Sequence, residues 1–303
     1  MKSLTAHFNN EEEKKEIVAR GENLFRARLS SVVDSIAERD DLRLITVSGP
    51  SCAGKTTSSA KLERSLEDHG YQVHVISIDD FFLDRDFLVR RAESRGEKPD
   101  FDSPDTIDFA AFADVISAIS SSRSARVPIF SFQSGSRVGY RTLMPTGKRD
   151  VYLIEGIQAV YPEVVACFGK SPFVSLFVSP EVNLSVNGVA LCAEDIRFLR
   201  RLVRDAKFRN AAPEFTFTLW ETVRSNEEKN IFPNLSAVTY RIDSYLEYEL
   251  YMIAPFAKAL LVGITPDSEH FVKAERYYRM LNSLPEISHT YLPSDSLFRE
   301  FIG

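Results

Sequence analysis

A glycine-rich segment has the residues of a phosphate-binding loop. Residues 49–56, Gly-Pro-Ser-Cys-Ala-Gly-Lys-Thr, satisfy the pattern G-x-x-x-x-G-K-[ST], with an apolar segment before them and a helical pattern after them. In this arrangement backbone N–H groups and the helix N-terminus cradle nucleotide phosphates. We expect Lys55 to reach the β- and γ-phosphates and Thr56 to coordinate Mg²⁺. The residues expected to hold ATP are Gly49, Ser51, Cys52, Ala53, Gly54, Lys55, Thr56 and Thr57.

Acidic residues follow two further predicted strands and are candidates for proton abstraction and metal binding. Asp79 and Asp80 follow the strand predicted over residues 72–78, and Glu155 follows the one over 151–154. Ligands of open α/β sheets bind beyond the carboxyl ends of the strands, so these side chains should face the phosphate loop. We expect Asp79 to accept the proton of a substrate hydroxyl, and Asp79 and Glu155 to contribute to the Mg²⁺ site.

A segment rich in arginine is a candidate lid. Helical periodicity over residues 194–209 places Arg197, Arg200, Arg201 and Arg204 near one face. Phosphoryl transfer spreads negative charge over the γ-phosphate oxygens, and a closing helix would bring arginines to them while excluding water. The alternative is a solvated helix face, the usual origin of a charge run. We favour the lid because a phosphate loop elsewhere in the chain requires such partners.

The elements predicted around these residues alternate strands with helices. Strands are expected over residues 42–47, 72–78, 151–154, 173–178 and 237–242, and helices over 55–68, 108–120, 194–209, 245–261 and 267–284. Residues 127–132 and 138–143 flank Gln-Ser-Gly-Ser-Arg like the two arms of a hairpin. This alternation predicts an α/β fold of the P-loop type, with a doubly wound, mainly parallel sheet, a small β-hairpin region and a helical Arg-rich lid.

One core with appendages is the simplest domain organisation, because no internal repeat or low-complexity linker divides the chain. We predict an N-terminal amphipathic helical extension over residues 1–40, interrupted or bent near Gly21. A core follows over residues 41–263, with the lid at about 193–230, and a C-terminal helical appendage occupies residues 264–303. An amphipathic helix packs equally well on its own core or on another subunit, which leaves the role of the extension open.

The composition is that of a soluble globular protein. The 303 residues include 37 Lys and Arg against 43 Asp and Glu, for a net charge of −6. This acidic balance is not typical of a nucleic-acid binder. Cys52, Cys167 and Cys192 fit neither a disulfide framework nor a zinc site, which favours a cytoplasmic location. We expect no signal peptide and no membrane partner, because no apolar segment is long enough.

Other catalytic classes lack their motifs. The segment around Ser51 does not have the final glycine of a nucleophile elbow, no H-E-x-x-H occurs, and no G-x-G-x-x-G follows a strand. The five histidines are scattered, so they are more typical of surface or packing positions than of a metal site. Hydrolase, zinc protease and dehydrogenase functions are therefore not supported.

Several motifs together resemble the uridine kinase and phosphoribulokinase family of P-loop kinases, over most of residues 44–261. They are GPSCAGKTT at 49–57, SIDDFF at 77–82, FDSPD at 101–105, PIFSFQSGSR at 128–137, IEGI at 154–157 and RRLVRD at 200–205. Their order and spacing, more than any one of them, carry the resemblance. The segments EKNIFP at 228–233 and LFREFIG at 297–303 are similar to a bacterial branch usually labelled uridine kinase-like.

The resemblance implies an ATP- and Mg²⁺-dependent kinase that phosphorylates the 5′-hydroxyl of a nucleoside, with a pyrimidine nucleoside expected. It makes Asp79 the general base and gives Arg201 and Arg204, with Lys55, the role of contacting the phosphates. Asp102 would bind the ribose hydroxyls, since a carboxylate accepts two hydrogen bonds from vicinal hydroxyls. The resemblance also implies a small-molecule substrate as partner and a homo-oligomeric state.

The acceptor side of the resemblance rests on aromatic and basic residues. Phe130 and Phe132 fall where the family places aromatics around the base, and Arg209 matches a substrate-side arginine. Phe82 and Phe130 stand where uridine-cytidine kinases usually have Tyr, and Gly135 where they have a base-reading His. Three polar groups that read the pyrimidine are thus missing, and a site loses the discrimination that such groups supply. Core packing is an equal explanation for the two Phe residues.

Two alternatives to a nucleoside kinase remain open. A kinase of the same fold could act on a sugar phosphate or a small organic acid, since Arg137 and Arg209 could hold such an anion. A non-catalytic ATP-binding regulatory module could instead use its terminal extensions to bind a partner and its ATP state as a switch. Pure nucleotide binding would not require Asp79, which favours an enzyme.

Overall fold

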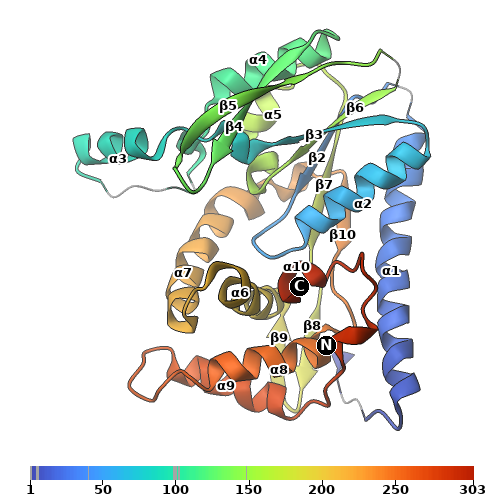
Figure 1. Ribbon diagram of the computed structural model, residues 1–303, viewed down its shortest axis with the longest axis vertical. Coiled ribbons are helices and arrows are strands. Elements are labelled where there is room, and N and C mark those ends of the chain that lie inside the picture. The colour runs from blue at the N-terminus through green and yellow to red at the C-terminus, as the bar shows by residue number, and fades with distance from the viewer. Residues whose placement is uncertain (1, 5–6, 40, 98–100, 102, 148) are drawn as a thin grey trace.

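A five-stranded parallel sheet forms the centre of the computed structural model, which describes the chain except for residues 1, 5–6, 40, 98–100, 102 and 148. The strand order is β10-β7-β2-β6-β3 (Figure 1). The strands are β2 (Leu44–Ser48), β3 (Gln72–Ser77), β6 (Asp150–Glu155), β7 (Phe173–Ser179) and β10 (Tyr240–Asp243). All neighbouring pairs in this sheet are parallel, which confirms the predicted sheet type.

Helices cover both faces of this sheet. Every residue of β2 is buried, as expected for a central strand that is covered on both sides. In β6, Leu153 packs into the core that contains residues of α1 and α2, whereas Ile154 packs into the core that contains residues of α4 and α5. These helices are α1 (Glu11–Ala37), α2 (Lys55–Asp68), α4 (Phe109–Ser120) and α5 (Pro162–Ala166). The predicted doubly wound arrangement is therefore confirmed.

The strand register brings the predicted site residues to one edge of the sheet. Glu155, the last residue of β6, lies opposite Val47 of β2 on one side and Ser77 of β3 on the other. The phosphate loop follows β2 directly, and a short 3₁₀ turn (Ile78–Phe81) follows β3 and carries Asp79. The carboxyl ends of three adjacent strands thus converge, as they do at ligand sites of open α/β sheets.

Helix α1 runs through Gly21 without interruption, so the predicted break near this glycine is wrong. The helix begins after Asn10, whose side chain accepts a hydrogen bond from the N–H of Glu13 at 2.9 Å. Gly21 serves packing instead, because a Cβ at this position would lie 2.9 Å from the Cδ1 of Tyr248. The N-terminal helix therefore packs closely on the core of its own chain.

A second layer of elements lies below the sheet in Figure 1. A three-stranded sheet there has the order β1-β8-β9. The layer consists of β1 (Lys2–Ser3), β8 (Asn183–Val186), β9 (Val189–Cys192), α6 (Ala193–Arg209), α7 (Pro213–Asn226), α8 (Glu249–Leu261), α9 (Phe271–Asn282) and α10 (Arg299–Ile302). The segment predicted as a C-terminal appendage joins the large core here, since Leu297, Phe298 and Phe301 are fully buried.

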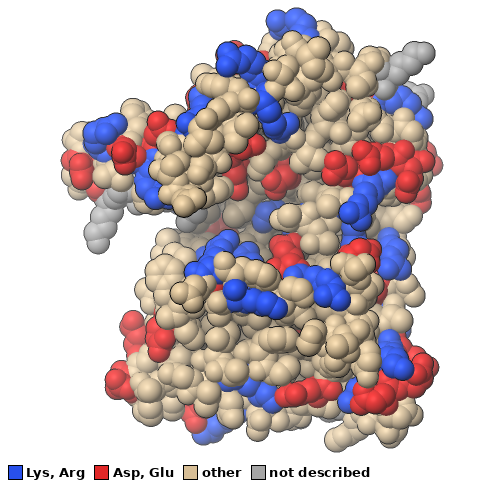
Figure 2. Space-filling view, in the orientation of Figure 1, with Lys and Arg blue, Asp and Glu red and all other residues tan. Residues whose placement is uncertain are grey.

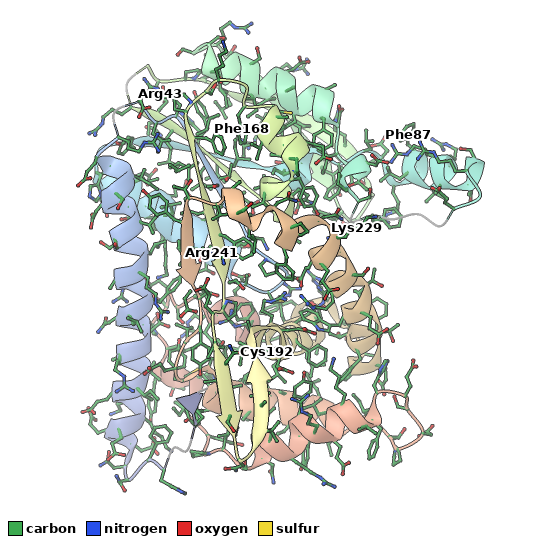
Figure 3. All side chains as sticks on the ribbon, turned by 180° about the vertical axis from the view of Figure 1, so that it is seen from behind. Arg43, Phe87, Phe168, Cys192, Lys229 and Arg241 are labelled. Atoms are coloured by element: carbon green, nitrogen blue, oxygen red, sulfur yellow. The ribbon has the colours of Figure 1, made fainter. Side chains whose placement is uncertain are left out.

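An antiparallel hairpin and a short helix stand at the other end of the molecule. The hairpin consists of β4 (Ala125–Ser131) and β5 (Ser136–Leu143), which confirms the prediction from the sequence. Its register shifts by an irregularity between Ile129 and Phe130. Helix α3 (Arg85–Ser94) projects from the body beside the hairpin, with Phe87 at its exposed side (Figure 3).

Two further observations concern covalent links and membranes. Cys52, Cys167 and Cys192 are all free, as the sequence predicts. Within the described part of the chain, no helix combines the length and apolar character needed to cross a bilayer.

Candidate active site

The phosphate loop makes a tight turn between β2 and α2. The N–H of Ala53 donates to the carbonyl of Pro50 at 3.2 Å, and the Nζ of Lys55 donates to the same oxygen at 3.1 Å. Gly54 has a φ of 91°, and a Cβ there would lie 2.6 Å from the Cδ1 of Leu297. Both the backbone conformation and the close contact therefore require glycine at the second conserved position of the motif.

Three arginines of α6 hold this loop. Arg197 donates to the carbonyl of Ser51 at 3.1 Å, and Arg200 donates to the carbonyl of Cys52 at 3.3 Å. Arg201 donates to the Oγ of Ser51 at 2.8 Å. These contacts hold the loop in place, because a guanidinium can bind several acceptors in a planar arrangement.

Buried carboxylates neutralise the two innermost arginines. Arg197 forms a bidentate pair with Glu227 at 2.6 and 2.8 Å, and Arg200 pairs with Glu249 at 2.7 Å. Glu227 also accepts the N–H of Ser51 at 3.1 Å. Arg197 and Arg200 therefore support the loop structurally. Of the four arginines predicted on the lid face, Arg201 and Arg204 line the cavity. The closing movement of the lid stays a prediction.

A cavity of about 440 Å³ opens in front of the loop. Figure 2 shows this face of the molecule hollowed between its two halves, with Lys and Arg side chains along the lower rim. The residues predicted from the sequence that line the cavity are Ser51, Cys52, Lys55, Thr56, Asp79, Phe82, Phe132, Glu155, Arg201, Arg204 and Arg209. Gly156, Ile157, Gln158 and Glu300 also line it and were not predicted.

The acidic side of the cavity has altered proton affinities. Burial, together with the nearby Glu155, raises the pKa of Asp79 to about 6, while Lys55 opposes the shift. Burial lowers the pKa of Lys55, an effect opposed by Glu300, Glu155, Cys52 and Asp79. A buried carboxylic acid with a pKa near neutrality, next to a phosphate loop, has the properties of a general base.

The cavity offers a hard-oxygen environment for Mg²⁺ but not a complete protein cage. Thr56, Asp79 and Glu155 supply hydroxyl and carboxylate oxygens. Within the described residues, no group of three or more His, Cys, Asp and Glu side chains is placed to hold a metal ion. This donor set fits Mg²⁺, which commonly takes one or two carboxylates and completes its ligands with water and substrate phosphate oxygens.

A basic cluster forms the opposite wall. Arg204 and Arg209 contact the Oδ1 of Asp205 at 2.9 and 3.2 Å, and Arg201 contacts the Oδ2 at 3.0 Å. Asp205 is buried, with 3% of its side chain exposed. One carboxylate cannot neutralise three guanidinium groups, so this wall keeps a net positive charge suited to phosphate groups.

The C-terminal helix α10 places Glu300 at the phosphate loop. Its Oε2 accepts hydrogen bonds from the N–H of Thr57 at 3.2 Å and from the Oγ1 of the same residue at 3.0 Å. The flanking Phe298 and Phe301 are fully buried, so the helix is firmly anchored. The carboxylate therefore occupies the first turn of α2, where a phosphate loop binds its anionic ligand.

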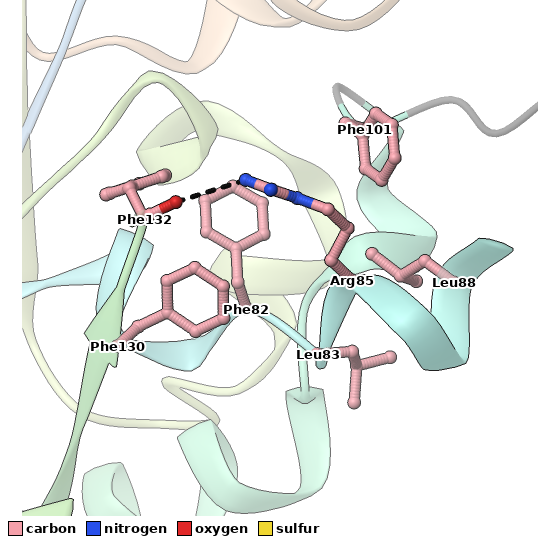
Figure 4. A pocket seen from close by; sticks show the side chains of 7 residues that line it. All are labelled: Phe82, Leu83, Arg85, Leu88, Phe101, Phe130 and Phe132. Carbon is pink, nitrogen blue, oxygen red and sulfur yellow. Dashed lines mark hydrogen bonds between the residues drawn. The ribbon is translucent and has the colours of Figure 1, made fainter. Parts of the chain in front are cut away.

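A second cavity, of about 350 Å³, adjoins the first (Figure 4). The rings of Phe82, Phe130 and Phe132 contact one another with centroid separations of 5.4 to 5.9 Å. Phe82 and Phe132 line both cavities, so the two cavities are neighbours at these side chains. The aromatic residues predicted around a base are thus brought together.

Some predicted residues lie elsewhere. Arg137 lines neither cavity, because its guanidinium is paired with the Oδ2 of Asp108 at 3.0 Å. Asp102 lies outside the described residues. Gly49, Ala53, Gly54 and Thr57 belong to the loop and the first turn of α2 and do not line the cavity. The proposed anion-binding role of Arg137 is therefore not supported by its position.

Comparisons with known proteins point to one family. Residues 44–246 match the family model described as Phosphoribulokinase / Uridine kinase family. Inorganic pyrophosphatase TTM2 of Arabidopsis thaliana is 28% identical over 68% of this chain and 26% of its own length. The chain covers 27% of the related TTM1 from the same plant. It thus spans about a quarter of the length of each of these two relatives.

Shorter proteins match over more of their length. The uridine kinase of Ureaplasma parvum serovar 3 is 22% identical over 60% of this chain and 78% of its own. Among solved structures, D-glycerate 3-kinase from Cryptococcus neoformans var. grubii is 15% identical and has a TM-score of 0.39, covering 86% of this chain and 87% of that chain.

Proposed function

Because this chain belongs to the phosphoribulokinase and uridine kinase family, we propose that it transfers the γ-phosphate of ATP to the 5′-hydroxyl of a nucleoside, with a pyrimidine nucleoside as the expected acceptor. The observation that carries the acceptor class is the aromatic cavity, which shares Phe82 and Phe132 with the cavity at the phosphate loop. A flat base packs well on aromatic rings. The sugar then lies between the two cavities, with its hydroxyl directed towards Asp79.

The roles of the polar residues follow from their positions in the larger cavity. Asp79 accepts the proton of the attacking hydroxyl as the bond to phosphorus forms. Lys55 holds the β- and γ-phosphates, and the basic wall with Arg201 and Arg204 stabilises the negative charge of the transferred group. Arg209 lies on the same wall, on the acceptor side.

Thr56, Asp79 and Glu155 are the residues that would hold Mg²⁺, because the ion prefers hydroxyl, carboxylate and phosphate oxygens. When bound, Mg²⁺ neutralises negative charge on the β- and γ-phosphates. Holding the ion would also favour the ionised form of Asp79, which is the form that accepts a proton.

A transfer assay tests the acceptor class. Labelled γ-phosphate from Mg-ATP is offered to uridine, cytidine, thymidine, purine nucleosides, ribulose 5-phosphate, pantothenate and glycerate. We expect transfer to at least one nucleoside. Transfer confined to a sugar phosphate or an organic acid would mean that the acceptor is an anion bound at the basic wall and not a nucleoside. No transfer to any acceptor would favour an ATP-binding regulatory module.

The pH dependence of the reaction is expected to report Asp79. The pKa of this carboxyl is raised to about 6 by burial and by Glu155, and only the ionised form accepts a proton. At a fixed saturating Mg-ATP concentration, kcat/KM for the acceptor should therefore be constant above pH 7 and fall about tenfold per pH unit below the pKa of Asp79, which bound Mg²⁺ holds below its metal-free value of about 6. Initial rates measured between pH 4.5 and 8.5 define this acidic part of the pH profile. A value of kcat/KM that rises as the pH falls from 6 to 4.5 would contradict the assignment of Asp79 as base, because protonation removes the proton acceptor.

The Glu300→Gln variant is expected to bind ATP about tenfold more tightly than the unaltered chain. The carboxylate of Glu300 accepts hydrogen bonds from the N–H and Oγ1 of Thr57 in the first turn of α2. It therefore competes with phosphate groups for this N–H and repels their negative charge. Glutamine keeps the hydrogen-bonding shape and removes the charge. Titration calorimetry with Mg-ATP measures the dissociation constant.

A surface glutamate provides the control for this prediction. Glu286 pairs with Lys258 and half of its side chain is exposed, so Glu286→Gln removes the same charge away from the loop. We expect its dissociation constant to stay within about twofold of the unaltered value, because exposed charges are strongly screened. Weaker binding in Glu300→Gln would mean that the carboxylate helps to hold the nucleotide.

A further inference from the structure

Arg85 is a charged residue at the aromatic cavity and, among the described residues that line it, the only one. It begins α3, and its backbone N–H donates to the carbonyl of Gly135 at 2.7 Å. Its guanidinium donates through Nη2 to the carbonyl of Phe132 at 3.1 Å (Figure 4). Both ends of the residue are thus tied to the hairpin turn, and the side chain is held at the cavity.

The space beside the hairpin turn is filled by this side chain. Gly135 has a φ of 67°, and a Cβ there would lie 2.9 Å from the Cβ of Arg85 and 3.0 Å from its Cζ. A side chain at position 135 and the observed Arg85 therefore exclude each other. Arg85 thus takes the place of a side chain at position 135 and is a polar side chain at this side of the cavity.

The other described side chains that line the cavity are apolar. Among the described residues that line it, Arg85 is accompanied by four phenylalanines and two leucines, which have no side-chain hydrogen-bonding group: Phe82, Phe101, Phe130, Phe132, Leu83 and Leu88. A guanidinium has five N–H donors and no acceptor. One donor is used on Phe132. The cavity can therefore donate hydrogen bonds from its described side chains, but these side chains cannot accept one.

The direction of the acceptor decides which edge of a base meets Arg85. In the proposed function, on which this inference rests, the ribose hydroxyl faces Asp79 and the base enters the aromatic cavity. The edge farthest from the sugar then lies inside the aromatic cavity, which Arg85 lines. That edge carries a carbonyl oxygen in uracil and thymine and an amino group in cytosine, and the corresponding purine position carries a carbonyl in guanine and an amino group in adenine.

We propose that Arg85 selects nucleosides with a carbonyl at this edge over those with an amino group. A carbonyl oxygen accepts a hydrogen bond from the guanidinium, whereas an amino group presents a second donor that finds no acceptor among the described side chains. Sites built to hydrogen-bond one substrate group discriminate against analogues that leave a polar group unpaired. The expected ranking is uridine over cytidine and inosine over adenosine.

The test compares matched substrates in the same enzyme preparation. We expect kcat/KM for uridine to exceed that for cytidine by at least about tenfold, since a hydrogen bond to a charged group supplies a factor of this size or more. The inosine and adenosine pair should show the same direction. In Arg85→Met, which keeps an apolar side chain over Gly135 and removes the donors, the ratio should fall to within about twofold of one.

A control and the contrary outcomes complete the design. Arg90 lies on the same helix and is exposed, as Arg85 is, but does not line the cavity, so Arg90→Met should keep the uridine preference. A loss of folded protein in Arg85→Met lowers both rates equally and leaves their ratio unchanged. Equal kcat/KM for uridine and cytidine in the unaltered chain, or an unchanged preference in Arg85→Met, would overturn this inference alone. Absence of transfer to every nucleoside would overturn the proposed function and this inference with it.

Discussion

The Asp79→Asn variant is expected to lose phosphoryl transfer by a factor of about 10²–10⁴, the usual contribution of a positioned general base. Asparagine has the shape of aspartate but cannot take up the proton of the attacking hydroxyl. ATP binding should remain, because the loop backbone and Lys55 hold the phosphates. Single-turnover transfer to the best acceptor, together with calorimetric titration of Mg-ATP, separates these two properties.

The adjacent Asp80 offers a matched control for this substitution. Its Oδ1 accepts the N–H of Phe130 at 3.2 Å and it does not line the larger cavity. In Asp80→Asn the amide oxygen can still accept this hydrogen bond, so we expect the transfer rate to stay within about threefold of the unaltered value. Equal losses in the two variants would mean that the charge of this segment, and not a proton acceptor at position 79, supports the reaction.

Stability provides a second readout for Asp79. Its pKa is raised to about 6 in the folded chain, above the ordinary aspartate value, so folding favours the protonated form. The ionised carboxylate therefore destabilises the fold at every pH above about 6, and the effect disappears as the pH falls towards 4. We expect Asp79→Asn to unfold at pH 7 at an equal or higher temperature than the unaltered chain. A group kept at the cost of stability is typical of an active site.

The sheet and the phosphate loop were predictable because their signals are local. Continuous apolar residues mark β2 and β6 as buried strands. The loop motif places Lys55 at the start of α2, where the structure begins the helix. Since parallel strands end at one edge of the sheet, Asp79 and Glu155 could be expected beside the loop without any knowledge of the packing.

The β8–β9 hairpin is absent from the predicted elements although its turn has a strong local signal. Asn187 and Gly188 lie between two short segments rich in apolar residues and have φ values of 47° and 81°. Asn-Gly in this setting is the commonest sequence of a two-residue hairpin turn. The prediction of a strand over residues 173–178 was correct in place, but it did not extend to this following hairpin.

The partners of the α6 arginines could not be predicted from spacing. Helical periodicity places Arg197 and Arg200 near Arg201, but their roles depend on Glu227 and Glu249, which come 30 and 49 residues later. Glu300 is more distant still, 243 residues from Thr57. No local pattern reports contacts of this kind, because they arise from how the second layer packs against the sheet.

The Glu227→Gln variant is expected to lose about 3–5 kcal/mol of folding free energy, the usual effect of removing one partner from a buried ion pair. Glu227 forms a bidentate pair with Arg197, and each side chain is 2% exposed. The neutral amide leaves the guanidinium charge of Arg197 buried without its counter-charge. For a chain of this length the melting temperature should fall by roughly 5–10 °C. Scanning calorimetry of the ligand-free protein measures the change.

The next residue supplies the control for Glu227→Gln. The side chain of Glu228 is 66% exposed and pairs with Arg224, so Glu228→Gln should cost less than about 1 kcal/mol, as exposed ion pairs usually do. Glu227 also accepts the N–H of Ser51, so its loss should loosen the phosphate loop and weaken ATP binding. If Glu227→Gln melts like the unaltered chain and binds ATP equally well, then α6 and the loop are held by packing, and the buried ion pair is not what supports the site.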